Sequence, residues 1–447
     1  MNTKAKTKIL VLGSGLVSRP GVRYLLAQKH LQVHVASNQP EIAAELVNGF
    51  AYGTSQYLDV MDTEFLTRLI EANDIIVSLL PWVLHVQVAK LCLHVGRHMA
   101  TTSYVSEEMR HLDEGARQKG LLFLNEMGVD PGMDHMSAMK IIDEVAAEGG
   151  KVRHFYSICG GLPAPQDNDN PFGYKFSWSP KGVVLASRNS AKFLENGQIV
   201  DIPGQDLFVR YRIEEVPPLG TFEVYANRNS LPYKDFYGLK DAATIMRGTY
   251  RYPGWCDTLK KIVDLGLVDD TPVAHLKGST YSQMMAELVG ATKGDDIEAK
   301  TAAKIGQVKG SPVMLRLRWL GLFSDEPLPD FDNHLDILSQ RMQEKMCYQK
   351  GEVDMLLLRH KFIVENKDKT TDMITSTLVD YGIPYGDSSM ARTVSLPLAI
   401  GVSAMAAGKI PLTGVQIPTT KVIYEPVLKE LAQLNIKMAE VRVRLQS

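Results

Sequence analysis

The stretch Lys8–Ser18, KILVLGSGLVS, decides the fold class of this chain. Its first half is an unbroken apolar run, which is typical of a strand buried on both faces of a parallel sheet. Gly13 and Gly15 follow at once, and the apolar spacing beyond them predicts a helix over Leu16–Lys29. A glycine-rich turn between a strand and a helix can hold a dinucleotide pyrophosphate at the helix N-terminus. We therefore predict a coenzyme site here, with Ser18 where a third glycine is usual.

The next hundred or so residues repeat this alternation of short apolar runs and helical patterns. Strands are predicted at Gln32–Ala36, Asp74–Leu80, His98–Ser103 and Leu121–Asn125, and helices at Val83–Val95 and Glu107–Lys119. Such spacing indicates βαβ units and a parallel sheet. Ligands bind beyond the carboxyl ends of parallel strands, so polar residues at these ends are candidates for a site.

The pattern changes after Gly128, where a second part of the chain begins. A helix at His135–Ala147 is followed by strands predicted at Val152–Ser157, Ser177–Val184, Gly220–Tyr225, Asp354–Val364 and Asp372–Val379, and by a serine-capped helix from Met390. We predict a dinucleotide-binding domain of residues 1–130 plus about 388–447, an α/β domain of 131–254 plus about 347–387, and a mostly helical insertion of about 255–346.

The composition is that of a soluble globular protein. The 447 residues are 45% apolar and 22% charged, which excludes a disordered or fibrous chain. Forty-nine Lys and Arg against 51 Asp and Glu leave a net charge of −2, which argues against a nucleic-acid-binding surface. The four cysteines form no CxxC pair, so neither a disulfide framework nor a zinc ribbon is expected. The apolar run Leu396–Ala407 is too short to span a bilayer and no secretory signal is evident, so we expect a cytoplasmic location and no membrane partner.

The choice of coenzyme is left open by the end of the second strand. An acidic residue there would bind a ribose 2′-hydroxyl and indicate NAD, whereas an arginine would pair with the 2′-phosphate of NADP. The sequence has Ala36, Ser37 and Asn38 at this place and therefore neither group. Arg19 is cationic and lies just past the glycines, but it could equally be a solvated helix residue.

A series of motifs then follows in order along the chain. They are Gly13-Ser-Gly15, Ser78-Leu-Leu-Pro81, Thr102-Ser-Tyr104, Asn125-Glu-Met-Gly-Val-Asp-Pro-Gly132, Cys159-Gly-Gly-Leu-Pro-Ala-Pro165, Asn170-Pro-Phe-Gly-Tyr-Lys-Phe-Ser-Trp-Ser179, Asn227-Arg-Asn-Ser230, Arg247-Gly-Thr-Tyr-Arg251, Trp319-Leu-Gly-Leu-Phe323 and Leu378-Val-Asp-Tyr-Gly382. Together they resemble the glutamate-forming saccharopine dehydrogenase family and the dehydrogenase half of the bifunctional lysine-degrading enzyme of animals and plants. The resemblance covers nearly the whole chain, and its most specific block is Cys159–Ser179.

The resemblance implies a fold and a reaction. The fold would be a Rossmann-like domain, a second α/β domain that binds substrate and forms a homodimer, and a small helical insertion. The reaction would be oxidation of saccharopine by NAD or NADP to L-glutamate and 2-aminoadipate 6-semialdehyde, or its reverse, in lysine metabolism. Two alternatives stay open: a carboxynorspermidine- or homospermidine-forming enzyme that reduces a different imine, and a non-catalytic regulatory protein that binds NAD(P). A cluster of arginines favours the tricarboxylate over a polyamine, which would need an acidic pocket.

Substrate contacts are implied by the resemblance together with the chemistry. They are Ser103, Tyr104, Asp130, Cys159, Arg228, Arg247, Thr249, Tyr250 and Arg251. The three arginines suit carboxylates, which guanidinium binds bidentately. Asp130 and Tyr104 are the catalytic candidates, and either of them or a bound water could act as the base. Asp130 could instead cap the helix near His135. We expect Cys159 to line the pocket, because hydride transfer needs no thiolate.

Coenzyme contacts are also implied by the resemblance, and they follow the predicted strand ends. They are Gly13, Ser14, Gly15, Leu16, Val17, Ala36, Ser37, Asn38, Asp59, Val60, Leu80, Thr102, Ser103, Val129, Asp130, Pro131 and Ser179. Asp59 could otherwise be the cap of a helix from Thr63 onward. We expect no metal, because the chemistry requires none.

Overall fold

The structure, a computed structural model, describes residues 6–446 and contains two compact units. The first unit extends to Gly150 and resumes over Gly386–Val441. The second unit covers Lys151–Tyr385 and takes the end of the chain from Arg442. Each unit is built on its own sheet, one parallel and one mixed. The predicted α/β class, with a parallel sheet beside a second α/β sheet, is therefore confirmed.

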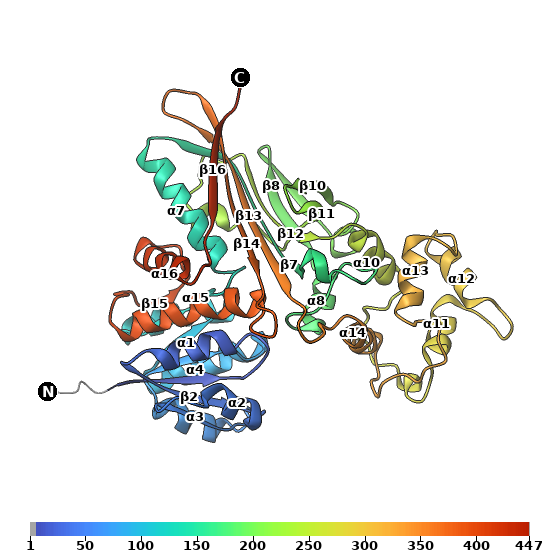
Figure 1. The fold of residues 1–447 in the computed structure, drawn as a ribbon, viewed down its shortest axis with the longest axis horizontal. Coiled ribbons are helices and arrows are strands. Elements are labelled where there is room, and N and C mark those ends of the chain that lie inside the picture. The colour runs from blue at the N-terminus through green and yellow to red at the C-terminus, as the bar shows by residue number, and fades with distance from the viewer. Residues whose placement is uncertain (1–5, 447) are drawn as a thin grey trace. The chain divides into compact units, whose positions relative to one another are not determined.

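The first unit contains a seven-stranded sheet in the order β15-β6-β5-β4-β1-β2-β3 (Figure 1). Its strands are β1 (Thr7–Leu12), β2 (Leu31–Ser37), β3 (Gly53–Tyr57), β4 (Ile75–Ser78), β5 (His98–Thr101), β6 (Leu122–Leu124) and β15 (Gly414–Gln416). Every pair in this sheet is parallel. The carboxyl ends of all seven strands therefore meet at one edge, which we call the carboxyl edge.

Helices connect these strands. They are α1 (Arg19–Ala27), α2 (Pro40–Val47), α3 (Thr63–Glu71), the short η1 (Trp82–Leu84), α4 (His85–Val95), α5 (Glu107–Arg110), α6 (Asp113–Gln118), α7 (Met133–Ala147), α15 (Ser389–Ala406) and α16 (Lys421–Gln433). One face of the sheet, including Leu10, Leu12 and Ile76, shares an apolar core with α3, α4 and α6. The unbroken apolar run of β1 is thus explained by burial of its last four residues, Ile9–Leu12.

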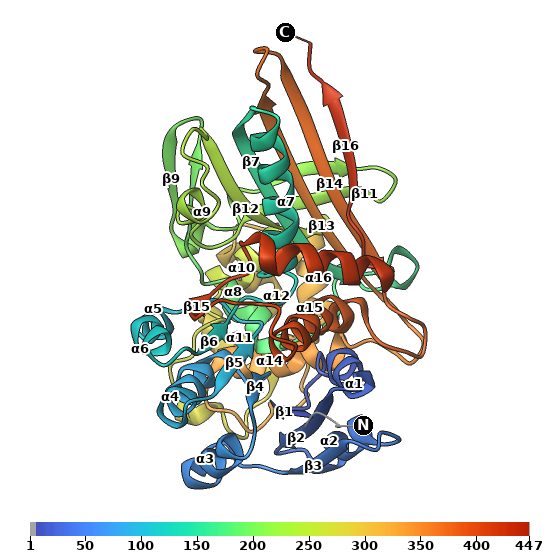
Figure 2. The same ribbon diagram turned by 90° about the vertical axis from the view of Figure 1, so that its left-hand side faces the viewer.

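Helix α15 packs against α1, and Figure 2 shows the two side by side. A Cβ added to Gly21 would lie 2.7 Å from the Ser395 backbone oxygen, so only glycine permits this approach. The helix is 18 residues long, longer than the predicted apolar run, and by length and composition alone it could cross a bilayer. However, 72% of it is buried, which is what a core helix shows.

The second unit contains a nine-stranded mixed sheet with the main order β10-β11-β12-β7-β13-β14-β16. Its strands are β7 (Lys151–Pro163), β8 (Ala191–Glu195), β9 (Gln198–Ile202), β10 (Arg212–Val216), β11 (Gly220–Ala226), β12 (Thr244–Arg251), β13 (Asp354–Glu365), β14 (Thr371–Tyr381) and β16 (Ala439–Arg444). The strands β7 and β12 are parallel, and both flanking pairs, β7 with β13 and β12 with β11, are antiparallel. Along each strand, every second side chain therefore points to the same face of this sheet.

The segment predicted as mostly helical follows β12 within the second unit. The helices of this unit are η2 (Pro165–Asp167), α8 (Pro180–Ala186), η3 (Gly204–Asp206), α9 (Tyr233–Phe236), α10 (Trp255–Asp264), η4 (Ala274–Leu276), α11 (Tyr281–Val289), α12 (Ile297–Lys304), α13 (Pro312–Trp319) and α14 (His334–Lys345). Residues of α10, α11, α13 and α14 belong to the same apolar core as the sheet residues of β7 and β11. Apolar contacts therefore join the helical segment to the sheet.

The prediction of a strand at Ser177–Val184 is wrong, because a helix, α8, begins at Pro180. The Ser179 hydroxyl accepts a hydrogen bond from the Gly182 N–H, and proline suits the first turn of a helix. The adjacent Val183 and Val184 favour a strand by propensity, but the cap and the proline determine the local structure. The helix predicted over Glu107–Lys119 is also interrupted, and it forms the separate helices α5 and α6.

Candidate functional site: the carboxyl edge and the arginine strand

The turn after β1 has the shape that its glycines predicted. Gly13 has φ +102°, and a Cβ there would lie 3.0 Å from the Leu79 backbone oxygen. A Cβ on Gly15 would have no neighbour within 4 Å, so the backbone at this residue is open to a ligand. The Ser18 hydroxyl donates to the Gly15 oxygen at 2.8 Å, so the serine is accommodated within the turn. These residues fit a pyrophosphate at the start of α1.

The end of β2 supplies neutral hydrogen-bonding groups. The Ser14 hydroxyl donates to the Ser37 hydroxyl at 2.8 Å, which joins the turn to this strand end. The Ser37 oxygen also accepts the Gln39 N–H at 3.1 Å, and Asn38 is exposed beside it. Arg19 forms an ion pair of 2.6 Å with Asp387. A coenzyme 2′-phosphate bound at the end of β2 would therefore contact neutral hydroxyl, amide and backbone N–H donors, because the nearby cation Arg19 is already paired with Asp387.

His85 joins the ends of two further strands, and the sequence interpretation missed it. Its Nδ1 lies 2.8 Å from the Ser78 hydroxyl, and its Nε2 lies 2.8 Å from the Ser103 hydroxyl. Burial lowers the pKa of His85 from 6.5 to about 4, so the ring is neutral near pH 7. A neutral imidazole can donate from one nitrogen and accept at the other, which suits two hydroxyl partners. No spacing rule in the sequence points to this histidine.

Tyr104 and Asp130, the two catalytic candidates, are brought together at the same edge. The Tyr104 hydroxyl donates to Asp130 Oδ1 at 2.9 Å. Asp130 does not cap helix α7, because Asp134 Oδ1 accepts the N–H groups of Gly132 and His135 there. The alternative role of Asp130 as a helix cap is therefore removed.

The remaining coenzyme candidates of the first unit also follow strand ends. Asp59 is exposed and its carboxylate accepts the Met61 N–H, whereas the cap of α3 is Asp62. The alternative role of Asp59 as a helix cap is thus wrong. The other candidates around this edge are Leu16, which is 71% exposed, the partly buried Val17, Val60, Leu80 and Thr102, and the buried Ala36 and Val129. Pro131 follows Asp130 through a cis peptide bond.

In the second unit, four substrate candidates share one face of two strands. Arg247, Thr249 and Arg251 alternate along β12, and Thr249 is paired in register with Cys159 on β7. Cys159 is buried. In-register neighbours on adjacent strands point to the same side, so these four residues lie on one face of the sheet.

The two arginines of β12 are buried among aromatic rings. The Arg247 guanidinium donates to the Tyr233 hydroxyl at 2.7 Å and lies 4.5 Å from the centre of that ring. Arg251 donates to the Tyr250 backbone oxygen at 2.8 Å, and its guanidinium lies 5.0 Å from the Tyr174 ring and 5.3 Å from the Trp255 ring. Cation–π contacts of this kind hold the charge in a desolvated place.

Three further candidates of the second unit lie elsewhere. Tyr250 occupies the opposite face of β12, and its hydroxyl donates to Glu214 Oε1 at 2.9 Å. Burial and Glu214 raise the pKa of this tyrosine well above 10, so it stays protonated. Arg228 is exposed, with a left-handed φ of +54°. Ser179 is exposed, and its hydroxyl caps α8.

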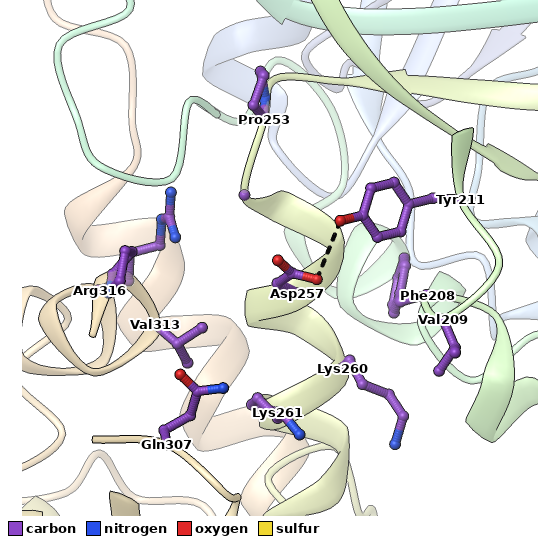
Figure 3. A pocket seen from close by; sticks show the side chains of 12 residues that line it. Phe208, Val209, Tyr211, Pro253, Asp257, Lys260, Lys261, Gln307, Val313 and Arg316 are labelled. Carbon is purple, nitrogen blue, oxygen red and sulfur yellow. Dashed lines mark hydrogen bonds between the residues drawn. The ribbon is translucent and has the colours of Figure 1, made fainter. Parts of the chain in front are cut away.

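A separate hollow of about 610 Å³ lies within the second unit (Figure 3). It is lined by Phe208, Val209, Tyr211, Pro253, Gly254, Asp257, Lys260, Lys261, Gln307, Pro312, Val313 and Arg316, none of which was a predicted site residue. The Tyr211 hydroxyl points to Asp257 at 3.3 Å. Among residues 6–446 no three His, Cys, Asp or Glu side chains form a group that could hold a metal ion.

Comparison with known proteins gives two family matches that together span most of the chain. Residues 9–124 match the profile described as the saccharopine dehydrogenase NADP binding domain, and residues 128–436 match that of the saccharopine dehydrogenase C-terminal domain. The saccharopine dehydrogenase [NADP(+), L-glutamate-forming] of Schizosaccharomyces pombe is 39% identical over 441 residues, which are 97% of this chain and 98% of the relative.

Two other relatives show how far the similarity extends. The mitochondrial alpha-aminoadipic semialdehyde synthase of Bos taurus is 35% identical over 95% of this chain but only 47% of its own length. The solved structure of apo histidine-tagged saccharopine dehydrogenase (L-Glu forming) from Saccharomyces cerevisiae matches with a TM-score of 0.88 and 37% identity. It covers 98% of this chain and 100% of that chain. Sequence is therefore similar over nearly the full length of the Schizosaccharomyces pombe relative, and fold over the full length of the Saccharomyces cerevisiae structure.

Proposed function

The chain belongs to the saccharopine dehydrogenase family, and on this premise we propose that it is an NADP-linked, glutamate-forming saccharopine dehydrogenase of lysine metabolism. In the oxidative direction, saccharopine loses a hydride from a carbon next to its secondary amine, together with the amine proton. Water adds to the resulting imine, and the C–N bond breaks to give L-glutamate and 2-aminoadipate 6-semialdehyde. The reverse reductive condensation uses the same groups.

The observation that carries this proposal is the Tyr104–Asp130 pair at the carboxyl edge. A phenol hydroxyl lies 2.9 Å from a carboxylate oxygen, beyond the ends of strands whose turn can bind a dinucleotide. Such a pair can accept the proton that the amine or the attacking water gives up, and can return it in the reverse direction. NADP, when bound, supplies the hydride acceptor. The protein contributes positioning and proton handling.

We assign the coenzyme as NADP. The family profile over residues 9–124 is that of an NADP-binding domain, and the closely similar fungal relatives are named as NADP(+) enzymes. The end of β2 agrees with this choice, because Asn38 brings no negative charge to a 2′-phosphate. Ser37 and Asn38 are our candidates for that contact.

The substrate would be recognised by its three carboxylates. Arg228 is exposed and can pair with a carboxylate directly. Arg247 and Arg251 are held among aromatic rings, which fixes the direction of each guanidinium. A guanidinium group whose direction is already fixed loses little conformational freedom when it binds a carboxylate. Buried arginines are therefore suited to orienting a substrate.

A spectrophotometric assay tests the function directly. Purified protein is mixed with saccharopine and either NADP or NAD, and the absorbance of the reduced nicotinamide is followed. We expect turnover with NADP well above that with NAD. Protein that binds NADP but does not turn over saccharopine would contradict the proposed reaction. A preference for NAD would contradict only the coenzyme assignment.

We also propose that the protein forms a homodimer through the free edge of the second sheet. β16 is the last strand of that sheet, and no strand within residues 6–446 pairs with its outer side. Val443 is 47% exposed and Leu445 is 36% exposed. The unpaired backbone groups of an edge strand can pair with a strand of another copy, and on β16 the apolar Val441 and Val443 alternate with the charged Glu440, Arg442 and Arg444. Light scattering of wild type, of Val443→Lys and of the control Val308→Lys, an exposed valine elsewhere in the same unit, should show monomers for Val443→Lys alone.

A cytoplasmic location is likewise our proposal. None of the four cysteines, of which Cys92, Cys159 and Cys256 are buried and Cys347 is exposed, is part of a disulfide, which suits a reducing compartment. The near-neutral net charge of −2 supports a small-molecule substrate over a nucleic-acid partner. Burial of α15 in the first unit supports its role as a core helix. Cell fractionation with activity measurement in each fraction tests the location.

A further inference from the structure

Glu126 adopts a backbone conformation that is unusual for its residue type. Its φ is +58°, in the left-handed region that favours glycine, and its side chain is buried. A side chain with a Cβ is disfavoured in this region, so it persists only where surrounding contacts hold it. Backbone strain of this kind collects at functional sites. The contacts of the Glu126 carboxylate indicate which function this conformation serves.

The two oxygens of this carboxylate bind two different segments. Oε1 accepts the backbone N–H of Val105 at 2.9 Å. Oε2 lies 2.7 Å from Nε2 of His135, which is fully buried in the first turn of α7. The backbone adds to the first connection, because the Glu126 N–H donates to the Ser103 oxygen at 3.2 Å. One side chain therefore joins the segment after β5 to the start of α7.

These two segments carry the catalytic candidates. Tyr104 directly precedes Val105, whose N–H the carboxylate holds. Asp130 lies in the short loop between Glu126 and α7. That loop is closely packed, because a Cβ added to Gly132 would lie 2.1 Å from the Gly128 backbone oxygen. Because this loop cannot change its shape freely, the contact between Glu126 and His135 at the start of α7 also fixes the position of Asp130.

We propose that Glu126, together with His135, is a positioning residue that sets Tyr104 against Asp130. This inference rests on the proposed function, since it assumes that the Tyr104–Asp130 pair handles the proton. Glu126 itself does not touch the reacting atoms. Misplacement of a reacting group by about 1 Å can cost on the order of 100-fold in rate, so loss of this connection should appear in turnover.

Two variants separate positioning from folding. Glu126→Gly removes the carboxylate but suits a φ of +58°, so the backbone should keep its conformation. Glu126→Gln keeps an oxygen for the Val105 N–H and an amide that can reach His135. We expect Glu126→Gly to lower kcat by about 10- to 100-fold. Glu126→Gln should recover part of this loss, and both variants should bind NADP with dissociation constants close to that of wild type.

Asp113→Asn is the matched control in the same unit. Asp113 also uses a carboxylate to accept a backbone N–H, that of Val415 at 2.7 Å, and to pair with a cation, Arg117. It lies on α6 and touches neither catalytic candidate. The control should keep wild-type kcat. A simple structural role of Glu126 would lower the Tm and the amount of active enzyme, with kcat per folded molecule unchanged.

The outcomes are distinct. A fall in kcat for Glu126→Gly, partly restored in Glu126→Gln and with NADP binding retained, supports the proposal. Wild-type kcat in both variants overturns it, and so does a loss explained entirely by unfolding. If wild-type protein binds NADP but does not turn over saccharopine, the proposed function fails first. The inference then fails with it, because there is no reaction for which the pair is positioned.

Discussion

The carboxyl edge of the first unit and the β12 strand of the second unit build their candidate groups in different ways. At the carboxyl edge, the polar candidates lie at or after strand ends, and hydrogen bonds from other side chains hold several of them, as His85 holds Ser103 and Asp130 holds Tyr104. On β12, the candidates alternate along one strand, and aromatic rings surround the charges of Arg247 and Arg251. The first arrangement depends on loops and the second on a rigid strand.

The difference shows which substitutions should affect chemistry and which should affect stability. A hydrogen-bonded loop can lose one group and keep its fold, so catalytic effects should dominate at the carboxyl edge. A buried arginine in an aromatic environment contributes to packing as well as charge, so its removal should affect the fold as well. The predictions below test this contrast.

The largest expected effect is that of Asp130→Asn. The substitution keeps the shape and a group that the Tyr104 hydroxyl can bind, but it removes the proton acceptor. We expect kcat to fall by about 100- to 10,000-fold, as for loss of a general base, with NADP binding retained. Steady-state kinetics and a fluorescence titration with NADPH measure the two quantities.

Asp62→Asn is the control for this change. Asp62 is the N-cap of α3, where asparagine serves as well as aspartate. Its kcat and Tm should match wild type. If Asp130→Asn also has wild-type kcat, then Asp130 has no part in the mechanism. The expectation that substitutions at the carboxyl edge mainly affect catalysis would then be wrong for this residue.

Much of the carboxyl edge was predictable because parallel strands impose a simple rule. The Gly13–Gly15 turn follows an apolar run, and residues such as Tyr104 and Asp130 lie shortly after predicted strands. Local pattern therefore located the glycine turn and the strand ends, and the family resemblance supplied most of the candidate residues there. The partners that hold them could not be found in this way. His85 meets Ser103, and Glu126 meets Val105, only through the folded arrangement of non-adjacent segments.

The second unit shows a different limit. The motif Arg247–Arg251 could be recognised, but its division between two faces depends on β12 being a strand in register with β7 and β11. Tyr250 consequently binds Glu214 on the face opposite Arg251. Strand β3 and helix α8 were missed, because weakly apolar residues form the first and a proline-started cap overrides valine propensity in the second.

The next prediction concerns the pH dependence of stability at the carboxyl edge. Burial lowers the pKa of His85 to about 4, whereas an unfolded chain protonates histidine at about 6.5. The unfolded state therefore takes up the proton first as the pH falls. The contribution of His85 to stability is complete above pH 6.5 and decreases towards pH 4, by about 3 kcal/mol in total.

Urea denaturation between pH 4.5 and 7 measures this effect. The free-energy difference between wild type and His85→Asn should shrink as the pH falls, because the variant lacks the titrating group. His94→Asn removes an exposed histidine of the same helix and should leave the pH dependence of wild type unchanged. A constant difference between wild type and His85→Asn would show that the ring is not held neutral by burial.

The arginines of the second unit test the other half of the contrast. Arg228→Ala should raise the KM for saccharopine by about 10- to 100-fold, because its exposed guanidinium is proposed to pair with a substrate carboxylate, and it should lower the Tm less than Arg251→Ala does, because the side chain is not buried. Arg251→Ala should raise KM and also lower the Tm, because it removes a buried side chain and its bond to the Tyr250 oxygen. Arg212→Ala, an exposed arginine paired with Glu195, should change neither quantity. An unchanged Tm for Arg251→Ala would mean that the aromatic surroundings do not depend on the guanidinium.

The smallest expected effect is a change of coenzyme preference in Asn38→Asp. A carboxylate at the end of β2 suits a ribose 2′-hydroxyl and repels a 2′-phosphate. We expect the ratio of kcat/KM for NADP to that for NAD to fall by about tenfold, which corresponds to about 1.4 kcal/mol. Initial rates with each coenzyme at fixed saccharopine measure the ratio, with the Asp62→Asn control alongside. If the ratio does not change, the 2′-phosphate binds away from Asn38. Arg19 would then be the next residue to substitute, because it is a cation just after the turn that could exchange its ion pair with Asp387 for one with the 2′-phosphate.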